Sequence, residues 1–205
     1  MSSVQKISLA EILELAGDIP AEGILKVIGR VAHKVRHEYM VLEHSPEEVC
    51  SLYQRFQSNE EVERTFSYLF AKFGEIERAR ESYKRHIHLL EKRTAYGMAG
   101  DVATEADKIL GGDLVFKVRA EESYIQQITE MDKERSRDGK TNETYYDEML
   151  FKAGQRERFR QSVEPKLKYW LGRGEFGLAA GICDKLERYE EAEKYRKLDQ
   201  ILKLD

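Results

Sequence analysis

The chain has 205 residues, of which 41% are hydrophobic and 35% are charged. Its net charge of −4, from 34 basic and 38 acidic residues, excludes the overall positive charge that is typical of polyanion-binding proteins. Cys50 and Cys183 lie far apart, which favours reduced thiols over a disulfide framework. No apolar run approaches the ~20 residues that a transmembrane helix needs, so we expect a soluble, cytoplasmic protein that does not enter a membrane.

Helix start and stop signals divide the first half of the chain. Serine followed three residues later by glutamate forms a capping box at Ser8, Ser45 and Ser58, and glycines positioned to end helices stand at 17, 74, 111 and 154. Apolar residues recur at helical spacing between these signals. The ambiguous run Leu114 to Val118 continues as a helical stripe as far as Met131, and no segment alternates strictly enough to predict a strand. The predicted helices are 9–16, 20–43, 46–57, 59–73, 75–93, 101–110 and one from 114 to about 131.

The second half begins after a polar stretch without aromatic residues at 132–144, which predicts an exposed linker between parts 1–131 and 145–205 that can still pack as one domain. Proline disfavours helix at the residue before it, so Glu164-Pro165 predicts a break. The predicted helices here are 143–153, 155–163, 165–172, 175–186 and 189–203. The chain as a whole is expected to be all-α.

A turn-and-helix string recurs along the chain. Gly74-Glu75-Ile76-Glu77-Arg78-Ala79 is echoed by Gly174-Glu175-Phe176-Gly177-Leu178-Ala179, and Glu187-Arg188-Tyr189-Glu190-Glu191-Ala192 repeats the form without its glycine. These strings resemble the tetratricopeptide repeat, over residues 63–92 and 145–203, and the segment 94–144 matches nothing in that pattern. Irregular α-solenoids of coat and ciliary-transport proteins are an equally fair comparison. The resemblance implies antiparallel hairpins stacked as a short solenoid of about ten to eleven helices, whereas an irregular helical bundle is the alternative.

No recognisable catalytic, cofactor or metal motif occurs in the sequence. His33 and His37 lie four residues apart on one predicted helix face, but a metal site needs at least one further ligand, and His44 lies beyond reach of that face. His86 and His88, two residues apart, are expected at the surface. Phosphate-binding glycine loops and nucleophile motifs are missing. We therefore expect no enzyme activity, no cofactor and no metal.

Two local clusters of basic residues are candidates for contact with a partner. The first contains Arg78, Arg80, Lys84 and Arg85 beside Tyr83, and the second contains Arg156, Arg158 and Arg160. A basic helix with an interleaved aromatic residue can contact RNA, but Tyr83 also stands where the repeat pattern places a core residue. A solvated repeat face, or a groove for an acidic partner, is the favoured explanation of both clusters.

The expected function is a protein-protein interaction or scaffold module, because stacked helix hairpins expose an extended binding surface. The alternative is an RNA-associated protein that binds through the basic helix at 78–93. The apolar end of the last helix, which contains Ile201, Leu202 and Leu204, predicts either self-association as a homodimer or terminal packing.

Overall fold

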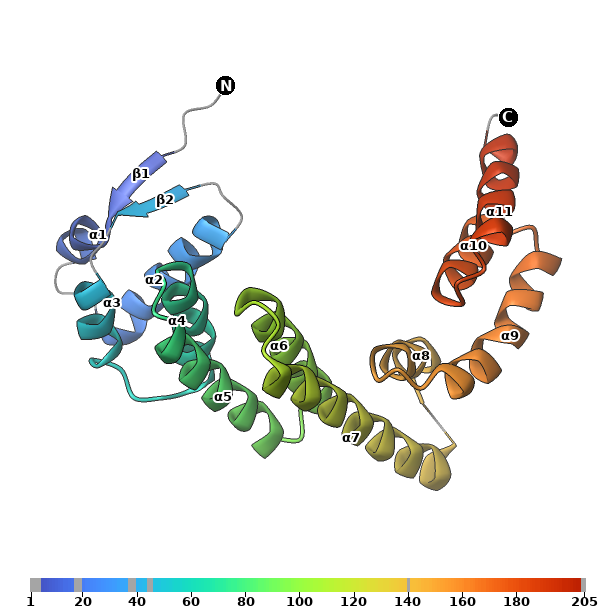
Figure 1. Ribbon diagram of the computed structural model, residues 1–205, viewed down its shortest axis with the longest axis horizontal. Coiled ribbons are helices and arrows are strands. Elements are labelled where there is room, and N and C mark those ends of the chain that lie inside the picture. The colour runs from blue at the N-terminus through green and yellow to red at the C-terminus, as the bar shows by residue number, and fades with distance from the viewer. Residues whose placement is uncertain (1–4, 17–19, 37–39, 44–45, 140, 204–205) are drawn as a thin grey trace. The chain divides into compact units, whose positions relative to one another are not determined.

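The computed structural model describes residues 5–16, 20–36, 40–43, 46–139 and 141–203 (Figure 1). Most of them are helical, and the eleven helices in this part of the chain confirm the all-α class and the expected number. The chain forms two compact units, Met1–Ser123 and Tyr124–Asp205. The helices are α1 (Leu9–Ala16), α2 (Ala21–Arg36), α3 (Pro46–Tyr53), α4 (Glu60–Lys72), α5 (Ile76–Lys92), α6 (Tyr96–Ile109), α7 (Leu114–Asp138), α8 (Glu143–Lys152), α9 (Arg156–Gly172), α10 (Phe176–Lys185) and α11 (Tyr189–Leu202).

A two-stranded parallel ribbon accompanies the first helices, and the sequence did not predict it. Strand β1 (Gln5–Ser8) pairs in register with β2 (Met40–Glu43), and Figure 1 shows the two arrows side by side near α1. The prediction of one helix over 20–43 is therefore wrong after Arg36, where α2 ends. The strand was missed because Met40–Glu43 is as apolar as the helix before it. The strand with which it pairs lies more than thirty residues earlier in the sequence.

The core of the first unit is built from the apolar stripes of α2, α3 and α4. Ile28, Val31 and Val35 of α2, which recur at helical spacing, are buried, and so are the phenylalanines of α4. The ring of Tyr53 on α3 packs edge-on against Phe66 and Phe70, with centroids 5.2 Å and 5.3 Å away. Aromatic pairs in this geometry are each worth about 0.5–1.5 kcal/mol beyond their buried area.

Five connections between consecutive helices share one backbone geometry, which we call the common turn. In each, one residue after the helix has a positive φ, and the amide of the next residue donates to the carbonyl five positions earlier, at 2.8–3.0 Å. This bond satisfies a helix-end carbonyl and defines a Schellman motif. The positive-φ residues are Gly74, Thr94, Gly154, Gly174 and Glu187. The connection between α6 and α7 makes the same bond, from the Gly112 amide to the Asp107 carbonyl at 2.8 Å, but it has a positive φ at two residues, Gly111 and Gly112.

Each common turn is followed by a small or aromatic residue that lies in the core. Five positions after the left-handed residue stand Ala79, Ala99, Phe159, Ala179 and Ala192, and each is at most 3% exposed. The alanines let the next helix approach closely, and the phenylalanine fills the same position between α8 and α9. The turn at Thr94 belongs to this set although the segment 94–144 was expected to match nothing, and it starts α6 at Tyr96 rather than at residue 101.

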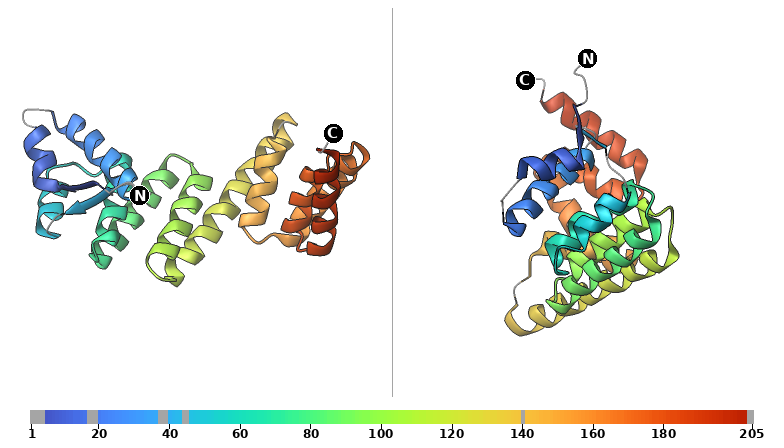
Figure 2. Two further views of the ribbon diagram at one scale, coloured as in Figure 1. Left: turned by 90° about the horizontal axis from the view of Figure 1, so that it is seen from above. Right: turned by 90° about the vertical axis from the view of Figure 1, so that its left-hand side faces the viewer.

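In the second unit, common turns join α8 to α9, α9 to α10 and α10 to α11. Leu167, Ala179, Ala180, Cys183 and Ala192 form one buried cluster of α9, α10 and α11. Figure 2 shows the antiparallel course of α10 and α11 at the red end of the chain.

Two sequence-based predictions in the second half are wrong. Pro165 lies inside α9, which runs unbroken from Arg156 to Gly172, because buried Val163 and Leu167 anchor it on both sides of the proline. The polar stretch 132–144 is helical as far as Asp138, because Asp132 is anchored to α8 and α9. The boundary between the units falls inside α7, at 123/124, rather than in this stretch.

The predicted capping boxes have different outcomes. At Ser8 the box is confirmed, with reciprocal bonds to Glu11 of 2.9 Å and 3.0 Å. At the start of α4 the cap is Asn59, whose Oδ1 accepts from the Val62 amide at 3.0 Å, so the prediction for Ser58 is wrong. Gly111 has the expected positive φ, whereas Gly17 and Ser45 lie outside the described residues.

Candidate partner-binding surfaces

The residues of the first predicted basic cluster do not form an open cationic surface, because acidic neighbours pair with all of them. Tyr83 is 1% exposed and packs edge-on against Phe116, so it is a core residue and cannot stack on a base. The ion pairs are Arg78–Glu75 (2.9 Å), Arg80–Glu77 (2.5 Å), Arg80–Asp113 (2.9 Å), Lys84–Glu81 (2.8 Å) and Arg85–Glu63 (3.2 Å).

Two of the three residues of the second predicted cluster are also paired with acidic side chains. Arg156 pairs with Glu187 of the neighbouring turn at 2.8 Å. Arg158 donates to Asp132 at 2.8 Å and to the Tyr146 hydroxyl at 2.6 Å. The Tyr146 hydroxyl in turn donates to Asp132 at 2.8 Å, and the two bonds that Asp132 accepts lower the pKa of its carboxyl despite its partial burial. Arg160 lines a pocket of about 420 Å³ and makes no ion pair with any described residue.

A buried carboxylate that no sequence pattern predicted joins α3, α4 and α5. Glu63 is fully buried and accepts hydrogen bonds from Tyr53 (2.8 Å), Ser58 (2.6 Å), Ser82 (2.6 Å) and Arg85 (3.2 Å). Burial and the bond to this carboxylate raise the pKa of Tyr53 to about 12. With four donors around it, the carboxylate stabilises the helix packing and has no face left for a substrate.

His86 is also buried, at 4% exposed, so the prediction of a surface residue is wrong, whereas His88 is exposed as expected. Position 86 follows Tyr83 and precedes Leu90 on the buried stripe of α5, and this helical spacing is the signal that was missed. Burial, with help from the positive charges of Arg64 and Arg93, lowers the pKa of His86 to about 4.

An apolar groove lies between α5 and the start of α7, and we call it the α5–α7 groove. It has a volume of about 530 Å³ and is lined by Lys84, Ile87, Leu114, Val115, Phe116, Val118, Arg119 and Glu122. Among these, Leu114, Val115 and Val118 are 69%, 62% and 44% exposed.

The first turns of α7 are apolar on two sides. Phe116 and Ala120 are buried against the unit, while Leu114 and Val118 lie on the opposite side, about 160–200° around the helix from Phe116. A helix on the surface of a protein normally has one apolar stripe and one polar face. The second apolar side of α7 therefore marks a surface that another element can cover.

A second groove, between α2 and α4, has a volume of about 630 Å³, and basic side chains surround it. Lys26, Arg30 and Lys34 come from α2, and Arg64 comes from α4. None of the four forms an ion pair with a carboxylate in the described ranges. The spacing of the three α2 residues by four could have predicted a basic helix face. It was missed because apolar residues separate the three in the sequence.

The end of α11, predicted to self-associate or to pack, has exposed apolar residues. Ile201 and Leu202 are 61% and 58% exposed, while Ala192 and Tyr195 pack on α10. Leu204 lies outside the described residues.

Searches for metal and membrane features have negative results within the described part of the chain. No group of three or more histidine, cysteine, aspartate or glutamate residues in it could hold a metal ion. No helix there is long and apolar enough to cross a membrane.

No known relative was found. Comparison of the chain with protein-family models, with curated proteins and with solved structures gives no match. The tetratricopeptide-like relationship stays a prediction.

Proposed function

We propose that this chain is a non-catalytic protein-binding scaffold, which holds an amphipathic helix of a partner protein in the α5–α7 groove. The observation that carries the proposal is the second apolar side of α7. Leu114, Val115 and Val118 are adjacent and exposed, and they border a groove of about 530 Å³. Grooves of this kind between helices accept an apolar helix face, read as anchors at helical spacing.

The rim of the groove supports a protein partner rather than a nucleic acid. Lys84 is paired with Glu81 at 2.8 Å, and Arg119 is paired with Glu91 at 2.5 Å. The charges at the rim are thus largely compensated, and the centre is apolar. This combination matches the apolar centre and polar rim of protein interfaces, whereas a nucleic acid would meet little net positive charge.

Affinity capture from the native cell with a matched pair of variants tests the proposal. Val115→Ser/Val118→Ser removes two anchors, and Lys92→Ser/Lys108→Ser makes the same number of changes at exposed positions outside α7 that do not line the groove. We expect the wild-type chain and the control to retain the same proteins and the valine variant to lose them. Retention that is equal in all three chains, or retention of RNA in place of protein, would contradict the proposal.

The size of the effect can be measured once a partner is identified. Full burial of a valine side chain contributes about 1.5–3 kcal/mol. Since roughly half of each side chain is exposed in the free protein, each valine should contribute about 1 kcal/mol. The double variant should then bind about 10- to 30-fold more weakly. Light scattering of the purified chain with and without Ile201→Ser/Leu202→Ser tests self-association through α11 separately.

A further inference from the structure

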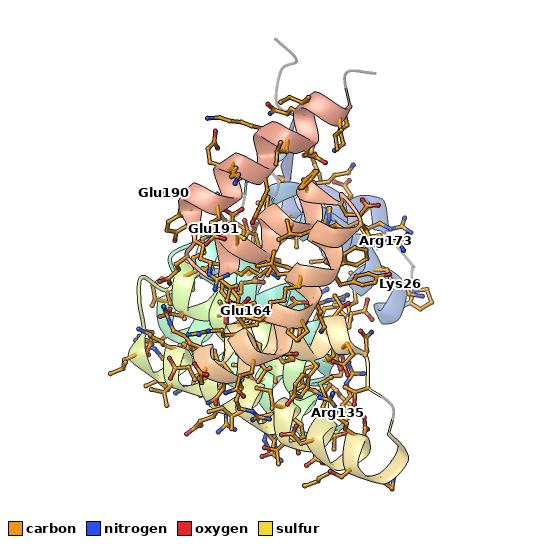
Figure 3. The ribbon with its side chains drawn as sticks, turned by 90° about the vertical axis from the view of Figure 1, so that its right-hand side faces the viewer. Lys26, Arg135, Glu164, Arg173, Glu190 and Glu191 are labelled. Carbon is orange, nitrogen blue, oxygen red and sulfur yellow. The ribbon has the colours of Figure 1, made fainter. Side chains whose placement is uncertain are left out.

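The solvent side of α2 carries mainly positive charge. After Glu22 in the first turn, the sequence from residue 23 to residue 36 contains Lys26, Arg30, His33, Lys34 and Arg36, and no acidic residue. Ordinary solvated faces mix charges of both signs. By helical geometry, Lys26, Arg30 and Lys34 lie opposite the buried stripe of α2, and Figure 3 shows Lys26 pointing away from the ribbon.

The spacing of these three residues forms a row. Four residues along a helix correspond to a rise of about 6 Å, so the row is about 12 Å long. Arg64 faces it from α4, and Glu61 is the acidic residue that lines the groove. None of the four cations has an ion pair among the described residues, whereas Arg78, Arg80, Lys84 and Arg85 all have one. Four cations that have no ion pair among the described residues therefore lie together at the α2–α4 groove.

The floor of the groove is made of small residues where the two helices cross. A Cβ atom added at Gly29 would lie 3.6 Å from Thr65 Oγ1, so α2 and α4 are in close contact there. Ala32 also lines the groove. Small residues at the floor leave room for a third rod-like element to lie between the cationic side chains.

We propose that the α2–α4 groove binds an acidic helical segment of a partner protein, at a site separate from the α5–α7 groove. Carboxylates spaced by four residues on a helix repeat every 6 Å or so, which is the step of the Lys26, Arg30 and Lys34 row. Single-stranded nucleic acids are bound through aromatic platforms beside the basic groove. Tyr68, the aromatic residue that lines this groove, is half-buried. The chemistry therefore favours a carboxylate-bearing helix over a phosphate backbone.

Fluorescence anisotropy with designed probes tests this proposal directly. The first probe is a labelled helical peptide of about 20 residues with glutamates spaced by four. A second peptide has the same composition with the glutamates distributed around the helix, and the third probe is single-stranded oligouridine. All are titrated with the full chain at about 50 mM salt, where electrostatic contacts are weakly screened.

Two triple variants of equal charge change separate the row from general electrostatics. Lys26→Gln/Arg30→Gln/Lys34→Gln removes the row, and Lys92→Gln/Lys108→Gln/Lys168→Gln removes three exposed lysines elsewhere. We expect the row variant to weaken binding of the first peptide at least about tenfold and the control to change it less than about twofold. The distributed peptide should bind about fivefold more weakly than the first to the wild-type chain.

Four outcomes would overturn the inference. They are no binding of the first peptide, equal binding of both peptides, equal loss in the two variants, and tighter binding of oligouridine that depends on the row. The last outcome would assign the groove to nucleic acid. Far-UV circular dichroism of both variants verifies that the helices are intact, because the substituted side chains lie on solvent-exposed positions.

Discussion

Lowering the pH should destabilise the first unit through His86. The imidazole is 4% exposed, and its pKa in the folded chain is lowered from 6.5 to about 4. Burial is the largest cause, and the positive charge of Arg64 acts in the same direction. In the unfolded chain the ring binds its proton near pH 6.5, whereas the folded chain leaves it neutral until about pH 4. The unfolded state therefore binds more protons throughout this window, and stability falls as the pH falls.

The expected magnitude follows from the two pKa values. One pKa unit corresponds to 1.36 kcal/mol, so between pH 7 and pH 5 the contribution of His86 to the free energy of unfolding should fall by about 2 kcal/mol. At pH 4 the loss should reach about 3 kcal/mol. His86→Gln removes the titrating group. Between pH 7 and pH 5, the free energy of unfolding of this variant should therefore fall by about 2 kcal/mol less than that of the wild type.

Two measurements test this reasoning. A ¹H–¹⁵N NMR titration, assigned by comparison with His86→Gln, should give a pKa near 4 for this imidazole. Urea unfolding at pH 7 and pH 5, followed by circular dichroism, measures the stability change. All five histidines lie in Met1–Ser123, and the single tryptophan, Trp170, reports on the other unit as an internal control. A pKa near 6.5, or the same pH dependence in His86→Gln and the wild type, would refute the explanation.

Three further substitutions test the local arguments. Glu187→Gly should stabilise the second unit by about 1 kcal/mol, because glycine adopts the φ of 60° without strain, and a lower urea midpoint of Trp170 fluorescence would contradict this. Pro165→Ala should stabilise the same unit by about 1–3 kcal/mol, since alanine restores a missing amide donor inside α9, and an unchanged midpoint would show that the proline is accommodated without cost. Glu63→Ala should destabilise the first unit by about 2–4 kcal/mol in thermal unfolding, because it leaves buried donors unpaired. Glu63→Gln should cost less because the amide keeps one acceptor, and equal losses would count against the network.

The sequence predicted elements well where a local signal determines the backbone. Gly74 and Gly154 have the expected left-handed conformation, and the helix ends that adjoin these two glycines lie within two residues of the predicted positions. Thr94 and Glu187 adopt the same conformation without glycine. Glu187 was recognised from the flanking aromatic and alanine, whereas Thr94 was missed although Tyr96 and Ala99 stand at the same spacing.

Predictions were wrong where distant packing overrides local preference. Pro165 stays helical because buried residues on both sides of it fix α9. The pairing of Met40–Glu43 depends on β1, which no local pattern near residue 40 can indicate. Asp132 continues α7 because Tyr146 and Arg158 bond to it from later helices.

The candidate surfaces were harder to predict than the helices. Clusters of basic residues in sequence, such as Arg78 to Arg85, are paired by acidic residues from their own and neighbouring helices. Lys26, Arg30 and Lys34 are separated by apolar residues and become a continuous row only on the helix surface. Local charge density is therefore a weaker guide to an open cationic surface than helical spacing combined with the absence of acidic neighbours.

The central claim is that the second apolar side of α7 holds a partner protein. Its most direct test is photo-crosslinking in the native cell. A photo-crosslinking amino acid replaces Val115, which is 62% exposed, in the full chain. A second chain carries it in place of Lys108 on α6 as a control. We predict a discrete protein adduct at position 115 that Val118→Ser abolishes and that position 108 does not form. Equal adducts at both positions, or no protein adduct at position 115, would contradict the claim.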